Sequence, residues 1–326
     1  MMEKDFAIGL DLGGTKILTA LMDKSGDIIC KFECETLADQ GEKVVIERVL
    51  SSIQQVLDTS KINQSRVRGI GVATAGVIDS KKGEIVVANN LGWRNVPIGR
   101  LIYDRFGIPV NLSNDANAAV IAEWIWGAGS GKQNLIYITV STGIGAGIIS
   151  NGHLITGVDN SAGEFGHISI ESNGHLCSCG NRGCLETLAS GTAIARIARE
   201  RLINGETSEY LSSRVNDVLD ITAKEIGEAA KYGDPFSIKL LNEVGYYLGI
   251  GVTNLIHLFN TEVIIFGGGV MNADEILLPI IRKTVQERGI RAMVEKVKIE
   301  KSTVGEEVGV KGAAGLFFIE REKEYI

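Results

Sequence analysis

Several features that the sequence lacks narrow the class of protein. No apolar run approaches the ~18 residues that a membrane-spanning helix needs. The opening segment MMEKDFAIGLDLGG carries acidic residues early and no small-residue cleavage site, unlike a signal peptide. Basic residues are not in excess, since 33 Lys and Arg stand against 40 Asp and Glu, for a net charge of −7. We therefore expect neither a membrane nor a nucleic acid as partner.

Cysteine is also scarce, and its placement is uneven. There are 5 cysteines, an odd number, and three of them fall in the segment CSCGNRGC. An extracellular disulfide framework would spread and pair its cysteines. Clustered thiols beside histidine indicate a metal site in a reducing compartment, so we expect a cytoplasmic protein.

Glycine is the abundant residue. The chain has 40 glycines in 326 residues, well above the usual level of about 7%. With only 4 prolines, this is not a linker composition. A folded protein with many positive-φ or close-approach backbone positions is indicated.

The order of predicted elements gives the fold class. Residues 6–35 predict three strands joined by glycine turns, and a similar strand–turn–strand pattern recurs at residues 135–157. Helical spacing is found at residues 42–60, in a helix that ends at Gly107, and in another that begins immediately after Asp115. Strands alternating with helices predict an α/β fold with mainly parallel connections. The two similar units suggest a duplicated architecture with a cleft between the halves.

Glycine turns at strand ends predict phosphate binding. In DLGGTK, residues 11–16, glycine lets backbone N–H groups turn toward an anion, and Asp11 is positioned to reach Mg²⁺ through water. A second turn, STGIGAG at residues 141–147, follows an equivalent strand, which strengthens this interpretation over an ordinary hairpin. A third close approach is available where three glycines follow TEVIIF at residues 267–269, and there the ligand group would be adenosine.

Asp115 has two interpretations. It stands between a predicted strand and an apolar helix, where Asp is a favoured N-cap. The same strand-to-helix junction in a parallel sheet is where ligands bind. Asp115 is therefore also a candidate general base that accepts a hydroxyl proton during phosphoryl transfer.

The cysteine cluster predicts a structural zinc site. His167, Cys177, Cys179 and Cys184 form H-x9-C-x-C-x4-C, and four N and S ligands suit tetrahedral Zn²⁺ with no open catalytic position. His153 and His175 are alternative fourth ligands, both in turn-like settings. The alternative interpretation is three reduced cysteines and an unrelated histidine.

Polar side chains near these motifs are candidates for sugar hydroxyls. Glu164 and Glu186 flank the metal loop, and carboxylates accept hydrogen bonds from hydroxyl groups well. Asn89 and Asn90 follow a short strand, where they either shape a turn or contact a sugar. The stretch from Gly76 to Asn90 would line the sugar pocket.

Together these residues resemble the ROK family of sugar kinases and related repressors, within the actin/hexokinase-like superfamily. The resemblance covers essentially the whole chain. It is carried by DLGGTK, ATAGVID, SNDANAA, STGIGAG, AGEFGH and CSCGNRGCLETLASG. The last two segments together are highly specific, whereas DLGGT is shared more widely.

The resemblance implies two RNase-H-like α/β domains. The smaller covers residues 1–115, with a C-terminal helix over about 307–326 packing back on it, and the larger covers 116–306 with the zinc loop. It also implies a homodimer or homotetramer. Family repressors carry an N-terminal helix-turn-helix, for which the residues before Asp11 leave no room, so the kinase branch is expected.

The resemblance also assigns roles by motif position. Asp115 is the catalytic base, and His167 is both a sugar contact and a zinc ligand. The other residues implied to hold the sugar are Gly76, Asn89, Asn90, Asn114, Glu164 and Glu186. The residues implied to bind ATP and Mg²⁺ are Asp11, Gly13, Gly14, Thr15, Lys16, Thr142, Gly143, Gly267, Gly268 and Gly269.

The implied reaction is ATP-dependent phosphorylation of a hexose at its 6-hydroxyl, with glucose as the favoured hexose. A kinase for N-acetylmannosamine, N-acetylglucosamine or another hexose is the alternative within the class. A catalytically silent sugar-sensing regulator is the alternative outside it. Ala75 and Leu91 stand where many family members have proline, and both lie on the sugar side, so they bear on which hexose is bound.

Overall fold

The protein is described from a computed structural model, of which residues 5–319 are described. The chain forms two compact units. The first contains the chain up to Gly131, the segment Leu154–Ala162 and the chain from Thr303 onward; the second contains Lys132–His153 and Gly163–Ser302. The expected boundary after residue 115 lies before helix α3, whereas the first unit extends beyond that helix. The reason is that α3 packs against α11, which returns to the same unit.

The first unit is built on a five-stranded sheet with the order β3-β2-β1-β4-β8. Strands β1 and β2 are antiparallel, whereas β4 runs parallel to both β1 and β8. A separate small sheet has the order β5-β6-β7. The elements of this unit are β1 (Phe6–Leu12), β2 (Lys16–Asp23), β3 (Ile28–Glu35), α1 (Glu42–Ser60), β4 (Val67–Thr74), β5 (Val77–Asp79), β6 (Glu84–Ala88), β7 (Trp93–Val96), α2 (Ile98–Phe106), β8 (Val110–Asn114), α3 (Asp115–Trp126) and α11 (Val308–Gly315).

The second unit is built on a sheet with the order β11-β10-β9-β12-β13. Strand β12 is parallel to both β9 and β13, and β10 is antiparallel to β9. The elements are β9 (Leu135–Val140), β10 (Ile144–Ser150), β11 (His153–Leu154), α4 (Leu185–Ala189), α5 (Gly191–Ile203), α6 (Glu209–Ser212), α7 (Ala223–Lys231), α8 (Pro235–Phe259), β12 (Val263–Gly267), α9 (Asp274–Arg288), α10 (Arg291–Val294) and β13 (Lys298–Lys301).

The two large sheets have the same topology. Each begins with an antiparallel hairpin, and in each the first strand of that hairpin is also parallel to the next strand of the sheet. Each sheet ends on a further parallel strand. This agreement confirms the duplicated strand–turn–strand unit and the α/β class expected from the sequence.

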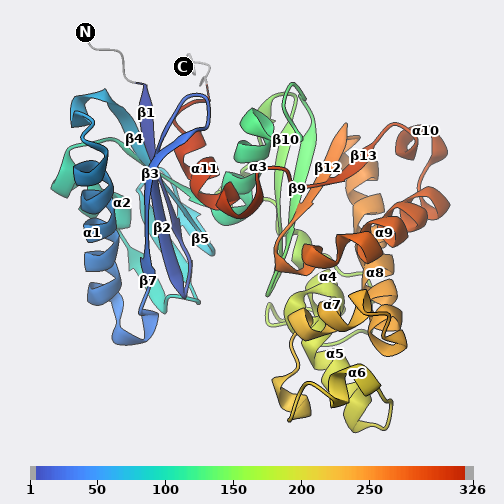
Figure 1. Ribbon diagram of the computed structural model, residues 1–326. Coiled ribbons are helices and arrows are strands. Elements are labelled where there is room, and N and C mark those ends of the chain that lie inside the picture. The colour runs from blue at the N-terminus through green and yellow to red at the C-terminus, as the bar shows by residue number, and fades with distance from the viewer. Residues whose placement is uncertain (1–4, 320–326) are drawn as a thin grey trace. The chain divides into compact units, whose positions relative to one another are not determined.

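The two faces of β1 are covered by helices in different ways. Ile8, Leu10 and Leu12 face the apolar core that includes α1, whereas Ala7 lies on the opposite face, in a cluster with residues of α11. Figure 1 shows α1 and α11 on either side of this sheet. Small residues line the α11 face because the helix backbone touches the sheet there. A Cβ at Gly9 would collide with the carbonyl oxygen of Val310 in α11.

Two expected helix limits are confirmed. Helix α1 covers Glu42–Ser60, and α2 ends before Gly107, whose φ of 65° suits the left-handed position that closes a helix. The C-terminal helix is shorter than expected, with α11 ending at Gly315. Residues 320–326 of the expected helix lie outside the described residues.

The N-cap of α3 is Asn114, so the interpretation of Asp115 as the cap is wrong. The side chain of Asn114 accepts a hydrogen bond from the N–H of Ala116 at 2.9 Å, and Asp115 is the first helical residue. One oxygen of Asp115 accepts from the same N–H at 2.9 Å. Because the cap is supplied by its neighbour, the second oxygen of Asp115 is left for another role.

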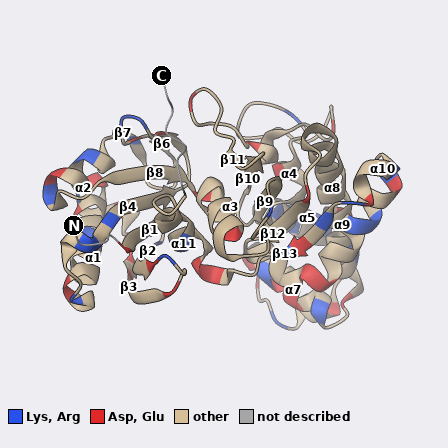
Figure 2. Cartoon of the chain, turned by 90° about the horizontal axis from the view of Figure 1, so that it is seen from above, with Lys and Arg blue, Asp and Glu red and all other residues tan. Residues whose placement is uncertain are grey.

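Charge is distributed in both signs along the helices. Figure 2 shows acidic and basic residues side by side on α1 and α7, in keeping with a net charge of only −7. Among residues 5–319, no helix combines the length and the apolar character needed to cross a membrane.

The close contact of α11 with the first sheet predicts a strong effect of one added methyl group. A Cβ at Gly71 of β4 would collide with the carbonyl oxygen of Ala313. We expect Gly71→Ala to lower the free energy of unfolding by about 1–3 kcal/mol, as overpacking of a rigid contact does. Urea denaturation measures it. Gly227→Ala in α7 is the matched control, because its Cβ would meet its nearest neighbour only at 3.9 Å. An unchanged stability of Gly71→Ala would contradict this packing.

Candidate active site

Asp11 and Asp115 are brought together by the parallel strands of the first unit. Strand β1 pairs with β4, which pairs with β8, and Thr74 lies opposite both Leu12 and Asn114. The carboxyl ends of β1 and β8 therefore meet at one edge of the sheet, where α/β proteins bind ligands. Asp11 lies at the end of β1, and Asp115 immediately follows β8.

The two carboxyl groups bind protons more tightly than ordinary aspartates. Burial, and then the charge of Asp115, raise the pKa of Asp11 to about 6, against the opposing effect of Lys16. Burial is also the main cause that raises the pKa of Asp115. A carboxylate with increased proton affinity is a better general base near neutral pH. Such oxygen ligands also suit Mg²⁺, whose charge would offset the repulsion between them.

Other residues predicted for the site lie near Asp11 and Asp115, and two contacts link them to one another. The side-chain amide of Asn114 donates to the carbonyl of Gly76 at 3.5 Å. A Cβ at Gly14 would lie 2.9 Å from the carbonyl oxygen of Asn90, so the β1–β2 turn touches the exposed turn after β6. Lys16 forms an exposed ion pair with Glu33 at 3.0 Å.

The remaining predicted residues of this unit lie in the same turns. Gly13 and Thr15 belong to the β1–β2 turn, where the N–H of Gly13 donates to the carbonyl of Lys16 at 3.0 Å. Asn89 is exposed beside Asn90. All of these roles stay predictions.

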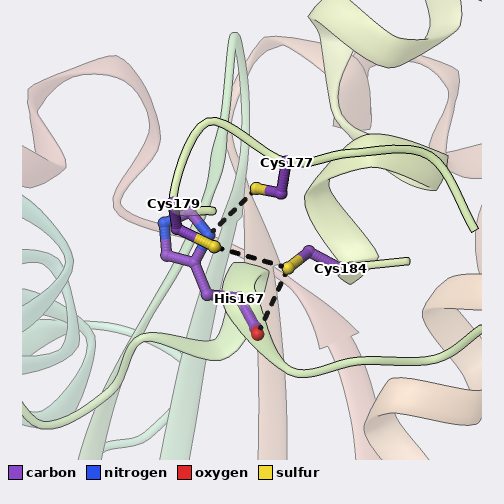
Figure 3. Close-up of side chains that lie close together, drawn as sticks. All are labelled: His167, Cys177, Cys179 and Cys184. Atoms are coloured by element: carbon purple, nitrogen blue, oxygen red, sulfur yellow. Dashed lines mark hydrogen bonds between the residues drawn. The ribbon is translucent and has the colours of Figure 1, made fainter. Parts of the chain in front are cut away.

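The second unit brings His167 and the three cysteines into one cluster (Figure 3). One ligand atom from each of His167, Cys177, Cys179 and Cys184 lies within 4.8 Å of the others. The Sγ of Cys177 is 3.5 Å from Nδ1 of His167, and the Sγ atoms of Cys179 and Cys184 are 3.6 Å apart. Of the alternative ligands, His153 instead contacts the carbonyl of Asn151 at 2.8 Å.

The separations of 3.5 and 3.6 Å fit an ion with tetrahedral coordination. With Zn–S of about 2.3 Å and Zn–N of about 2.0–2.1 Å, two ligand atoms at a tetrahedral centre lie about 3.5–3.8 Å apart. The donor set of three thiolates and one imidazole also matches structural zinc. The other ring nitrogen of His167, Nε2, lies 3.8 Å from Oε2 of Glu164. The cluster therefore orients an imidazole and a carboxylate together.

Glu186 contacts the second glycine turn. Its Oε2 accepts a hydrogen bond from the N–H of Ile144 at 2.9 Å, and a Cβ at Gly143 would lie 2.5 Å from the same oxygen. Glu186 is in the first turn of α4, two residues after Cys184, the last cysteine of the cluster. The predicted sugar carboxylate and the predicted phosphate turn are therefore in direct contact.

A cavity of about 990 Å³ adjoins the same turn within the second unit. Thr142 and Gly269 line it. The three consecutive glycines have different roles: a Cβ at Gly267 would collide with the hydroxyl of Tyr137, Gly268 has a φ of 90°, and a Cβ at Gly269 would meet nothing within 4 Å. Gly269 is thus the one of the three that borders the open space.

The sequence analysis missed the polar residues that surround this cavity. Basic and hydroxyl side chains line it from α5, both ends of α7 and β13: Thr192, Arg196, Arg199, Thr222, Lys224, Lys231 and Lys301. They come from segments distant in the sequence, and no motif links them. These basic side chains outnumber the acidic ones in the same lining, Glu228, Asp274 and Glu275, and the excess of positive charge suits a phosphorylated ligand.

Comparisons with known proteins support these assignments at the level of family. The model of the ROK family matches residues 7–319. A glucokinase from Thermotoga maritima is 36% identical over 320 residues, which are 97% of this chain and 98% of that protein. A xylose repressor from Caldicellulosiruptor bescii is 31% identical over 95% of this chain and 77% of the repressor. A ROK family glucokinase from Streptomyces griseus, solved with glucose and AMPPNP, has a TM-score of 0.82 and 33% identity over 95% of this chain and 98% of its own.

Two α/β units built on sheets of the same topology are the architecture of the actin- and hexokinase-like ATPases. The chain belongs to the ROK family within that class, and it is a kinase of this family.

Metal analysis checks the cysteine cluster. We expect about one zinc per chain in the purified protein, and loss of the metal with a lower melting temperature in Cys179→Ser. Cys34→Ser is the matched control, because Cys34 lies on β3, outside the cluster. Protein without zinc, or a Cys179→Ser variant that keeps it, would contradict the assignment.

The raised pKa of Asp11 predicts a pH-dependent penalty in stability. Between the ordinary value of 3.8 and about 6, the folded state binds more protons than the unfolded state, so the free energy of unfolding falls as pH rises through this window. We expect Asp11→Asn to melt at a higher temperature than the wild type at pH 7 without Mg²⁺ or nucleotide, and to lose this advantage toward pH 4. Thermal melts across this pH range measure it. Asp39→Asn, at an exposed carboxylate, should show no such trend; equal melting of Asp11→Asn and wild type at pH 7 would exclude the effect.

Proposed function

We propose that this protein is a glucokinase that transfers the γ-phosphoryl group of ATP to the 6-hydroxyl of glucose. The observation that carries the proposal is Asp115, half-buried at the strand end beside Asp11, with a raised pKa and with the cap of α3 supplied by Asn114. The glucokinase from Thermotoga maritima, with which the chain shares nearly its whole length, supports the choice of glucose.

The first unit supplies the base and part of the sugar site. A carboxylate oxygen of Asp115 accepts the proton of the 6-hydroxyl as that oxygen attacks the phosphorus atom of the γ-phosphoryl group, and ADP leaves. The increased proton affinity of Asp115 favours this transfer near neutral pH. Asn114, with Gly76, Asn89 and Asn90, would orient the sugar.

Asp11 and the β1–β2 turn would serve the phosphates. Mg²⁺, when bound with ATP, neutralises charge that develops on the phosphoryl oxygens. Asp11 would hold the ion through water, while Gly13, Gly14, Thr15 and Lys16 lie in the turn that faces the phosphates. Zinc would have no chemical step, since all four of its ligands are protein side chains.

The second unit supplies the nucleotide pocket and the remaining sugar contacts. Thr142 and Gly143 would bind phosphates, and the cavity that Gly269 borders would hold the nucleoside. Glu164 and His167 would be oriented by the cysteine cluster. The carboxylates of Glu164 and Glu186 would accept hydrogen bonds from ring hydroxyls, and His167 would donate one. Water bound at these positions would be replaced by the sugar, whose hydroxyls match these carboxylate and imidazole groups.

An ADP-release assay across glucose, mannose, fructose, allose, N-acetylglucosamine and N-acetylmannosamine tests the substrate. We expect the highest kcat/KM with glucose. A higher kcat/KM with an N-acetylhexosamine would make that sugar, and not glucose, the proposed substrate. ADP release with none of them would favour a sugar-sensing regulator, the reading that the similarity to the xylose repressor supports.

Replacing the base tests the mechanism. Asp115→Ala should lower kcat by at least about 100-fold, the usual contribution of a positioned general base, while glucose and nucleotide still bind. Turnover and calorimetric binding measure the two effects. Asp104→Ala, on the exposed face of α2, is the control variant. Full activity of Asp115→Ala would overturn the assignment.

A further inference from the structure

The turn at residues 141–144 is held in place by the segment that carries α4 and the start of α5. The N–H of Ile144 donates to Glu186 at 2.9 Å, and the N–H of Gly191 donates to the carbonyl of Ser141 at 2.7 Å. The hydroxyl of Thr192 donates to the carbonyl of Thr142 at 2.8 Å. The proposed phosphate turn thus depends on α4 and α5 for its position.

Glu186 is the one of these anchors that is also a proposed sugar ligand. Within the described residues, the bond to Ile144 is the only hydrogen bond that its carboxylate makes. An ionised carboxylate has two oxygens and about four acceptor positions. Glu186 can therefore hold the turn with Oε2 and accept a sugar hydroxyl with its remaining positions.

The contact between the carboxylate and the turn is tight. A Cβ at Gly143 would lie 2.5 Å from Oε2 of Glu186, a separation at which one group must move. A shift of the carboxylate would therefore displace the turn, and a bulkier turn would displace the carboxylate. Glu164 differs, because its carboxylate lies 3.8 Å from Nε2 of His167, and the carboxylate that a Cβ at Gly143 would meet is that of Glu186.

We propose that Glu186 is a positioning residue that couples hexose binding to nucleotide binding. A sugar hydroxyl on the carboxylate restricts its motion, which orders the turn before the nucleotide phosphates arrive. Preordering of this kind increases the affinity for the second ligand, and the coupling is reciprocal. The inference rests on the proposed function, because it requires that Glu186 contact a hexose.

Each ligand measured without the other separates coupling from direct contact. Calorimetry with Mg·ADP and no sugar should show about tenfold weaker binding to Glu186→Ala, since a hydrogen bond to a charged acceptor is lost from the turn. Glu186→Gln keeps an acceptor oxygen for the N–H of Ile144 and should restore most of the affinity. Glu164→Ala is the matched control, which should weaken glucose binding and leave Mg·ADP binding unchanged.

The reverse experiment changes the turn and measures the sugar. Gly143→Ala should weaken glucose binding without nucleotide by about tenfold, because the new methyl group displaces Glu186. Gly269→Ala is its control: Gly269 borders the nucleotide cavity, but a Cβ there meets nothing within 4 Å, so glucose binding should not change. This pair keeps the test decisive if Glu186→Ala does not fold.

The outcomes separate the coupling from the function itself. A wild-type protein that binds glucose and Mg·ADP, with Glu186→Ala unchanged toward Mg·ADP and Gly143→Ala unchanged toward glucose, would overturn the coupling and leave the kinase proposal intact. A wild-type protein that binds no hexose would overturn the proposed function. In the wild type, saturating glucose should tighten Mg·ADP binding by about fivefold or more, and this effect should disappear in Glu186→Ala.

Discussion

The first unit depends on one constraint, the contact of the α11 backbone with the backbones of β1 and β4. It is possible only because Gly9 and Gly71 present no side chain to the helix. The same closeness continues to the strand end, where Gly309 of α11 lies against the carboxylate of Asp11, and a Cβ there would collide with it. Helix packing thereby removes water from Asp11, and burial is the main cause of its raised pKa. The helix that stabilises the sheet thus also sets the chemistry at its edge.

In the second unit, the candidate ligand turn is positioned by polar contacts and not by closely packed small residues. Its glycine turn is fixed by hydrogen bonds with Glu186 of α4 and with Gly191 and Thr192 at the start of α5. Glu186 in turn lies two residues after Cys184 of the cysteine cluster. A structural ion at that cluster would therefore act on catalysis only through position, by fixing where α4 begins. The position of residues 141–144 and that of the Glu186 carboxylate therefore depend on the same hydrogen bonds.

Particular residues show how far sequence reasoning extends. The limits of α1, the cysteine cluster and the repeated strand–turn–strand unit were predictable, because each depends on periodicity or on ligand types close together in the chain. The choice between Asn114 and Asp115 as the cap of α3 was not, since both are good capping residues and the backbone angles decide between them. The basic side chains of the cavity beside Thr142 were also hidden, because Arg196, Lys224 and Lys301 come from three separate elements.

The sequence alone determined the family, the α/β class and the residue types available for phosphoryl transfer, because these follow from local motifs that do not depend on long-range contacts. Only the tertiary structure decided which glycines are required by packing and which border open space or a polar side chain. Gly267 and Gly268 are required by packing and turn geometry, whereas Gly269 borders open space and Gly143 touches a carboxylate. All four residues are glycine in the sequence. What differs is the atom that each backbone meets, and that is fixed by segments far away in the chain.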